Sequence, residues 1–303
     1  MKKLLKKIYL LISILILLCL FSAQVILAST SIPFTYNVLP QEANQSIIDT
    51  KSQKKLTFKL YEPIDTIYYD GKEIKIQDDT FQIDVSKLSG KNTITFLNSE
   101  NQSVSFSYYF SDKKGKVDDY ELVEGKNLTT YVTTHKNVKI IYTSKEKSAA
   151  KRMISYLKKL PNKLLENLDT ITMIPYENDS NIAGVTKENS ITLYKFSQYS
   201  STTQKNIIYH EIAHTWASYL MQNKIIDYSY TDYSTFAKAD KNFVSNYAKE
   251  HMEEKESYSE DFAESVSFYF INQRSFKKKY PQRFAYINNL LKLKIDEKSE
   301  EEN

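Results

Sequence analysis

The hydrophobic periodicity of this chain changes near residue 111, and that change constrains the fold more than any other feature. Residues 34–110 alternate apolar with polar side chains and are rich in Ile, Val, Thr, Tyr and Phe, as in short β-strands. Asp70-Gly71, between two of these runs, is a strong signal for a tight hairpin. Further along, strand-like runs are mixed with segments of helical spacing. The sequence therefore predicts a small all-β sandwich of immunoglobulin-like type, followed by an α+β domain.

The first 28 residues have the features of a secretory signal peptide. Four lysines precede an apolar run from Ile8 to Leu20, and Ala28 offers a small residue at the expected cleavage site. The alternative is an uncleaved N-terminal membrane anchor, because the run is nearly continuous to Ala28. The single cysteine, Cys19, lies inside this leader, so an exported mature chain has no disulfide and depends on core burial. This pattern favours a protein secreted by a Gram-positive bacterium, outside the cell or on its surface.

Charge excludes one class of partner. The chain has 41 basic and 37 acidic residues, and four of the basic residues lie in the leader, which leaves 37 of each. A mature chain without excess positive charge does not support nucleic-acid binding. We expect a monomer that contacts a membrane only through an uncleaved N-terminus. The expected segments are a signal peptide at 1–28, a β-sandwich at 29–111, a linker at 112–119, an α+β domain at 120–292 and an unstructured acidic tail at 293–303.

The most informative motif is in residues 207–216, which read IIYHEIAHTW. On a helix, His210 and His214 lie one above the other, so that both imidazoles can reach one tetrahedral cation. Glu211 is turned ~100° from His210 around the helix axis and is poorly placed to bind the same ion. It can still reach a water molecule held at the ion. This is the H-E-x-x-H pattern of zinc peptidases, in which the glutamate is the general base.

The helix that carries this motif is expected over residues 202–221. Ser201 and Gln204 fit a capping box at its start. The less specific interpretation is a buried helix that contains two histidines by chance. Isolated buried histidines are common, but two at this spacing with a glutamate after the first are rare. The chance interpretation is weakened for that reason. A separate apolar stripe should fix the helix against a core: Ile208, Ile212, Trp216 and Leu220.

A catalytic zinc ion needs a third protein ligand. His135 and His251 do not have the spacing of a third histidine that follows the motif closely. Residues 257–270 predict a helix on which Glu260 and Glu264 share one face. Glu260 could bind the ion while Glu264 accepts a hydrogen bond from a ligand histidine. The alternative is that both glutamates face solvent near a helix N-terminus, where the helix dipole favours acids.

Three segments together, YHEIAHTW, SNYAK and SEDFAESVSFYF, resemble the catalytic domain of anthrax lethal factor and its smaller secreted relatives, including the clostridial Pro-Pro endopeptidases. The resemblance covers residues 120–292 and implies a zincin-like metallopeptidase domain. It also implies roles for individual residues: His210, His214 and Glu260 as zinc ligands, Glu211 as the catalytic acid and base, and Glu264 as a partner of a ligand histidine.

The resemblance further implies a tyrosine that stabilises the transition state. Tyr247 has the S-x-Y-A context typical of the family, but it lies thirteen residues before Glu260, a longer interval than usual. Tyr258 lies nearer to Glu260 in the wrong context. We expect Tyr247 to be the functional residue, with Tyr258 as the alternative. Either tyrosine could instead be purely structural.

These features together predict a secreted zinc-dependent endopeptidase that hydrolyses extracellular or surface proteins, with one catalytic Zn²⁺ and Glu211 as general base. The partner is a protein or peptide substrate, which should pair with an edge strand formed by residues 181–186 or 190–195. The alternative is a secreted binding or adhesin-like protein whose zincin-like domain is inactive. A purely structural zinc site is disfavoured, because such sites prefer cysteine ligands and the mature chain has none.

Overall fold

The computed structural model describes residues 38–41, 45–60, 66–69, 72–75, 80–97, 102–123, 126–176 and 182–293. The predicted signal peptide, the turn residues Asp70 and Gly71 and the acidic tail from residue 294 lie outside these ranges. The strands on either side of that turn pair antiparallel with Tyr69 opposite Lys72, as the predicted tight hairpin requires. The chain divides into two compact units, and the division passes through individual strands. Unit 1 contains residues 1–44, 55–83 and 93–107, and unit 2 contains residues 45–54, 84–92 and 108–303.

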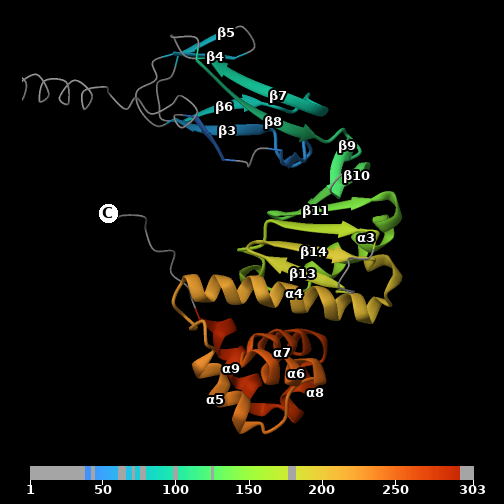
Figure 1. The fold of residues 1–303 in the computed structure, drawn as a ribbon, viewed down its shortest axis with the longest axis vertical. Coiled ribbons are helices and arrows are strands. Elements are labelled where there is room, and N and C mark those ends of the chain that lie inside the picture. The colour runs from blue at the N-terminus through green and yellow to red at the C-terminus, as the bar shows by residue number, and fades with distance from the viewer. Residues whose placement is uncertain are drawn as a thin grey trace, which may run out of the picture. The chain divides into compact units, whose positions relative to one another are not determined.

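Unit 1 is built from strands wherever the structure describes it (Figure 1). One sheet has the order β1-β3-β6, and the strands β8, β7, β4 and β5 follow one another in a second sheet. Phenylalanines form the core: Phe58 stacks on Phe81 at 5.2 Å between ring centroids and meets Phe96 edge-on at 4.9 Å. The immunoglobulin-like topology stays a prediction. The strand bounds are β1 (Val38–Pro40), β3 (Lys55–Leu60), β4 (Thr66–Tyr69), β5 (Lys72–Lys75), β6 (Thr80–Asp84), β7 (Gly90–Leu97) and β8 (Ser103–Phe110).

Unit 2 contains a six-stranded mixed sheet with the order β13-β14-β12-β11-β10-β9. The central strands β11, β12 and β14 are parallel, whereas β13 pairs antiparallel with β14 and forms an edge. In addition, β2 (Ile47–Ile48) pairs with the end of β8. The sheet strands are β9 (Lys116–Val123), β10 (Lys126–His135), β11 (Val138–Thr143), β12 (Thr170–Ile174), β13 (Gly184–Lys187) and β14 (Ser190–Tyr194).

Residues 112–119, which we expected to form a linker, belong to unit 2. Gly115 adopts φ +76°, and its amide donates to the Asp112 carbonyl oxygen at 2.8 Å, closing a tight turn. The main chain of Val132 lies so close that a side chain at position 115 would collide with it. Because β9 begins directly afterwards at Lys116, this polar segment is a turn at the start of a sheet strand.

Seven α-helices follow or interrupt the strands of unit 2 in its described residues. The long helix α4 lies between the sheet and the cluster of C-terminal helices (Figure 1). Its predicted apolar stripe is buried, and Trp216 of this stripe lies 6.0 Å from Phe262 of α7 between ring centroids. The helices are α3 (Lys147–Leu157), α4 (Ser201–Gln222), α5 (Thr231–Ala239), α6 (Asn246–Lys255), α7 (Ser259–Ile271), α8 (Gln273–Lys279) and α9 (Pro281–Lys292).

The capping-box prediction at the start of α4 is wrong by one residue. The cap is Ser200, whose Oγ accepts a hydrogen bond from the Thr203 amide at 3.2 Å. Gln204 does not turn back to the helix terminus. It is fully buried, donates to the Phe196 carbonyl oxygen at 2.7 Å and accepts from Arg152 Nε at 2.9 Å. Its amide therefore fixes α4 to the neighbouring elements.

No helix in the described ranges has an apolar stretch long enough to cross a bilayer.

Candidate metal centre

Three side chains bring potential ligand atoms to one point between α4 and α7. His210 Nε2 lies 3.1 Å from His214 Nε2 and 3.0 Å from Glu260 Oε2, and His214 Nε2 lies 3.5 Å from the same oxygen. Ligands held tetrahedrally at ~2.0–2.1 Å from zinc are about 3.3 Å apart. The three atoms therefore already have the separations that a zinc ion requires. Within the described part of the chain this is the one such group of three, and neither His135 nor His251 belongs to it.

The hydrogen-bonding state of these atoms also fits a cation. Glu260 Oε2 is buried, and no residue of the described chain makes a well-directed hydrogen bond to it. The two facing imidazole nitrogens can share only one proton between them. Buried polar atoms without partners are rare in native proteins, and a metal ion bound by all three atoms would satisfy them together. The donor set, two imidazoles and one carboxylate, suits zinc.

The electrostatics of the centre favour positive charge. Burial alone would lower the pKa of His210, but the Glu260 and Glu264 carboxylates outweigh it and raise that pKa to about 10. Burial would likewise raise the pKa of Glu260, but its close contacts with His210 and His214 hold it well below its usual range. Both shifts favour positive charge at this point, which a bound metal cation would also supply.

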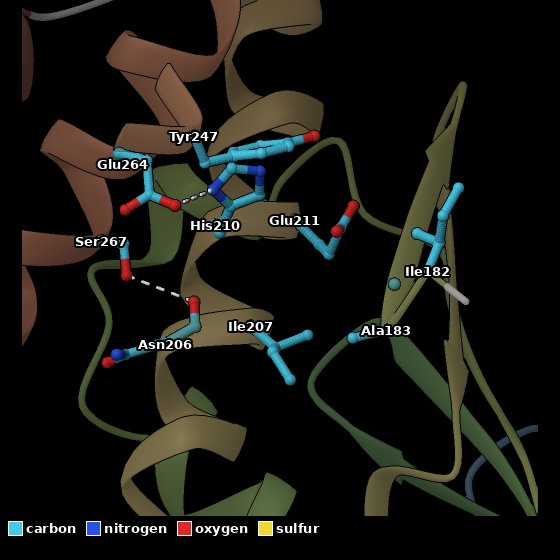
Figure 2. Close-up of a pocket in the computed structure, with 10 residues that line it drawn as sticks. Ile182, Ala183, Asn206, Ile207, His210, Glu211, Tyr247, Glu264 and Ser267 are labelled. Atoms are coloured by element: carbon cyan, nitrogen blue, oxygen red, sulfur yellow. Dashed lines mark hydrogen bonds and ion pairs between the residues drawn. The ribbon is translucent and has the colours of Figure 1, made fainter. Parts of the chain in front are cut away.

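Helix α7 positions the glutamates because both lie on the side of its first turns that faces α4. Glu260 is the second residue of the helix, and Glu264 follows one turn later. Glu264 Oε1 lies 3.2 Å from His210 Nδ1, behind the ring nitrogen that faces Glu260 (Figure 2). Such a contact fixes the orientation and tautomer of a ligand histidine. Phe262, Ala263 and Val266 supply the buried face of the helix, as the sequence predicts.

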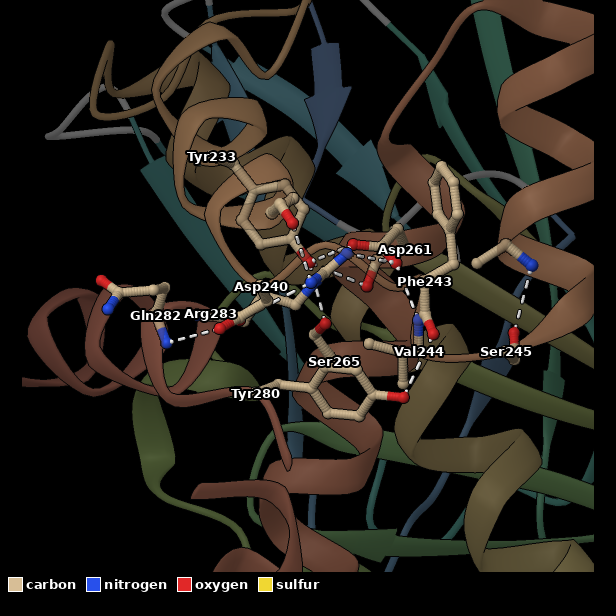
Figure 3. Close-up of polar contacts among 12 residues, drawn as sticks. Tyr233, Asp240, Phe243, Val244, Ser245, Asp261, Ser265, Tyr280, Gln282 and Arg283 are labelled. Atoms are coloured by element: carbon tan, nitrogen blue, oxygen red, sulfur yellow. Dashed lines mark hydrogen bonds and ion pairs between the residues drawn. The ribbon is translucent and has the colours of Figure 1, made fainter. Parts of the chain in front are cut away.

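Asp261, the residue after Glu260, fixes the start of α7 through a buried ion pair (Figure 3). Arg283 Nε donates to its Oδ2 at 2.8 Å, and Tyr233 Oη donates to the same oxygen at 2.7 Å. The Val244 amide donates to Asp261 Oδ1 at 3.2 Å, just before α6 begins. One buried carboxylate thus holds both the helix that carries Glu260 and the entry to the helix that carries Tyr247.

Tyr247 lies beside the metal centre. Ser245 caps α6 by accepting from the Ala248 amide at 3.1 Å, which places Tyr247 in the first turn. Its ring centroid is 6.3 Å from that of His210, and the two rings are tilted by 55° to one another (Figure 2). Tyr247 is 55% exposed, and partial desolvation, followed by the negative charges of Glu260, Glu211 and Glu264, raises its pKa.

Tyr258 has a different environment. It is buried in the core of unit 2, where its ring lies 6.2 Å from both Phe243 and Tyr233 between centroids. It lines neither of the cavities at the metal centre. The long interval between Tyr247 and Glu260 is taken up by the rest of α6 and a short turn. The structure therefore brings Tyr247, and not Tyr258, to the site.

Glu211 extends from α4 toward the edge strand β13 (Figure 2). It is 7% exposed, and Thr186 Oγ1 donates to its Oε2 at 2.7 Å. A Cβ atom on Gly184 would lie only 2.7 Å from Glu211 Oε1, so any side chain there would force the Glu211 side chain to shift. The sequence reasoning missed both contacts. An isolated glycine in a short strand is a sign of close approach by another group, and that signal was available in the residues AGVT.

Two cavities of about 390 and 430 Å³ meet at the centre and share residues from α4, β13 and α6. The first extends along α4 toward Asn206 and Ile207, and the second extends the other way toward His214 and Ser218. The edge strand β13 lines both, since Gly184 belongs to each. The shared lining residues are Ile182, Gly184, His210, Glu211 and Tyr247.

Comparison with known proteins gives weak similarities. No family model matches the chain, and no curated protein sequence matches it. Among solved structures, yeast LTA4 hydrolase in complex with bestatin is similar with a TM-score of 0.24 and 12% identity, covering 64% of this chain and 47% of the yeast chain. Native yeast LTA4 hydrolase gives a TM-score of 0.22 and 11% identity, covering 62% and 46%. This chain thus spans about half the length of the yeast enzyme. At such TM-scores the likeness defines no shared fold, and function must be argued from the site.

Proposed function

We propose that this chain is a secreted zinc-dependent endopeptidase. The observation that carries the proposal is the triangle formed by His210 Nε2, His214 Nε2 and Glu260 Oε2, with sides of 3.1, 3.0 and 3.5 Å. A third protein ligand distinguishes a catalytic zinc site from two histidines that meet by chance. The glutamate that follows His210 and the cleft around the centre supply the other parts that hydrolysis needs.

Zinc bound there would polarise the scissile carbonyl and bring the pKa of a water molecule toward ~7. The Glu211 carboxylate accepts the proton of the attacking water and delivers it to the nitrogen of the leaving amine. Tyr247 donates a hydrogen bond from its phenolic hydroxyl to the carbonyl oxygen as negative charge develops there. Glu264 holds the ring of His210 from behind.

The shape of the cleft favours an endopeptidase over an exopeptidase. The two cavities extend from the shared residues in opposite directions along α4, toward Asn206 on one side and Ser218 on the other. A peptide can therefore continue on both sides of the bond to be cleaved. Because β13 is an edge strand, its outer main-chain groups can pair with an extended peptide. Secretion is proposed from the N-terminal leader alone.

Zinc content and peptide cleavage together distinguish the enzyme from the alternative, a binding protein with an inactive domain. Purified protein should contain about one zinc ion per chain and should cleave members of a diverse peptide library. Chelation should stop cleavage and added zinc should restore it, and sequencing of the products gives the cut sites. Stoichiometric zinc without cleavage of any peptide would favour the binding protein, and absence of bound metal would contradict both the centre and the enzyme.

A further inference from the structure

The strand β13 turns two of its residues toward α4. Gly184 is paired with Leu193 and Thr186 with Ile191 across the antiparallel β13–β14 ladder. Directly opposed residues lie on the same face of a sheet. Leu193 and Ile191 are fully buried in the core that α4 also lines. Position 184 and the side chain of Thr186 therefore face the helix that carries the metal-binding motif.

The Thr186 hydroxyl lies close to both the side-chain carboxylate and the main-chain carbonyl of Glu211. Its Oγ1 lies 2.7 Å from Glu211 Oε2 and 3.0 Å from the Glu211 carbonyl oxygen. A hydroxyl has one hydrogen to donate, and its bond to an ionised carboxylate is the stronger of the two alternatives. The contact connects the carboxylate to the edge strand, and it holds the side chain in one orientation relative to its own main chain.

Gly184 lies next to Oε1, the other oxygen of the Glu211 carboxylate. A Cβ at this position would lie 2.7 Å from Glu211 Oε1 and 2.9 Å from Glu211 Cγ, closer than real Cβ contacts. Any side chain there would displace Glu211. Figure 2 shows the Glu211 side chain extending from α4 toward the strand that follows Ala183.

We propose that Thr186 is a positioning residue for Glu211, and that Gly184 keeps open the space that the Glu211 carboxylate occupies. The inference rests on the proposed peptidase function, in which Glu211 is the general base. A base must be held near its productive geometry, because a displacement on the order of 1 Å can cost ~10²-fold in rate. Neither Thr186 nor Gly184 contributes an atom to the zinc triangle.

The test compares Thr186→Val with Thr186→Ser in the full chain loaded with zinc. Valine keeps the shape of threonine and removes the hydroxyl, so kcat should fall roughly 10- to 100-fold with little change in KM. Serine restores the hydroxyl and should bring kcat back to within about threefold of wild type. Zinc affinity, measured by competition with a chromophoric chelator, should be unchanged in both. Thr186→Ala removes the same hydroxyl without filling its space and should repeat the loss.

Thr192→Val is the matched control. Thr192 is on the paired strand and belongs to the opposite face, since it pairs with Val185. The same substitution there should leave kcat near wild type. Equal kcat in Thr186→Val and wild type would overturn the inference, as would a loss in Thr186→Val that serine does not restore.

Crystal structures of the zinc-loaded variants separate this inference from the proposed function. The Glu211 carboxylate should leave its position in Thr186→Val and in Gly184→Ala, and it should keep that position in Thr186→Ser. An unmoved carboxylate in Thr186→Val contradicts the positioning role whether or not the wild-type chain cleaves peptides. A wild-type chain that binds zinc and cleaves nothing contradicts the proposed function alone.

Discussion

Glu260 and Asp261 are consecutive residues that face different sides of the first turn of α7. Glu260 Oε2 lies 3.0 Å from His210 Nε2 at the metal centre, and Asp261 Oδ2 accepts from Arg283 Nε at 2.8 Å in the core. The third ligand is thus carried by a helix terminus that a buried ion pair holds in place. Arg283, Asp261 and Asp240 are all at most 1% exposed, and Arg283 is the cation that pairs with both carboxylates.

Arg283→Met should destabilise the protein by about 3–5 kcal/mol, because it leaves the Asp261 and Asp240 carboxylates buried without their cationic partner. The change should appear as a lower midpoint in urea denaturation of the zinc-free chain. Glu253→Gln on α6 is the control, since it removes a solvent-exposed pair with Lys249 at 3.6 Å and should cost less than about 1 kcal/mol. Equal midpoints for the two variants would show that the buried pair does not hold α7.

Glu211→Gln should keep the fold and the bound zinc while reducing kcat by at least ~10²–10⁴-fold, because an amide cannot accept the proton of the attacking water. Gln has nearly the same shape, and its side-chain oxygen can still accept from Thr186. Circular dichroism and metal analysis should match those of wild type. Turnover near the wild-type rate would rule out Glu211 as the general base.

The two glutamates of α7 should differ in their effect on metal binding. Glu260→Ala removes a ligand atom and should abolish zinc binding at neutral pH. Glu264→Ala removes only the contact behind His210 and should weaken binding by ~10–100-fold. Both affinities can be measured by competition with a chromophoric chelator. If the two variants retained zinc equally, the third ligand would be misassigned.

Residues related by local helix geometry could be placed from the sequence. The spacing of His210 and His214 fixes their common direction on any α-helix, and the same holds for Glu260 and Glu264. The sequence also predicted that these two pairs meet, through the likeness of the motifs to a peptidase family. The structure brings their atoms to 3.0–3.5 Å of one another.

Contacts between elements distant along the chain were not predictable in the same way. The hydrogen bond from Thr186 to Glu211 joins residues 25 positions apart and depends on how β13 packs against α4. The capping residue of α4 was misplaced because Ser200 and Ser201 are both suitable caps, and tertiary packing gives Gln204 another role. The place of Tyr247 depends on the Val244–Asp261 contact, which no spacing rule indicates.

The last prediction concerns the two tyrosines that sequence context left as alternatives. Tyr247→Phe removes a hydroxyl beside the metal centre and should reduce kcat by ~10²–10³-fold, as expected for loss of one oxyanion donor. Zinc affinity should not change, because the phenol is not part of the ligand triangle. Tyr258→Phe is the control: its ring packs in the core against Phe243 and Tyr233, so its kcat should stay close to wild type. Initial rates on one cleaved peptide, measured over a range of concentrations, give kcat and KM for each variant. A large loss in Tyr258→Phe with none in Tyr247→Phe would reverse the assignment. No loss in either would show that neither of these two tyrosines stabilises the charge on the carbonyl oxygen.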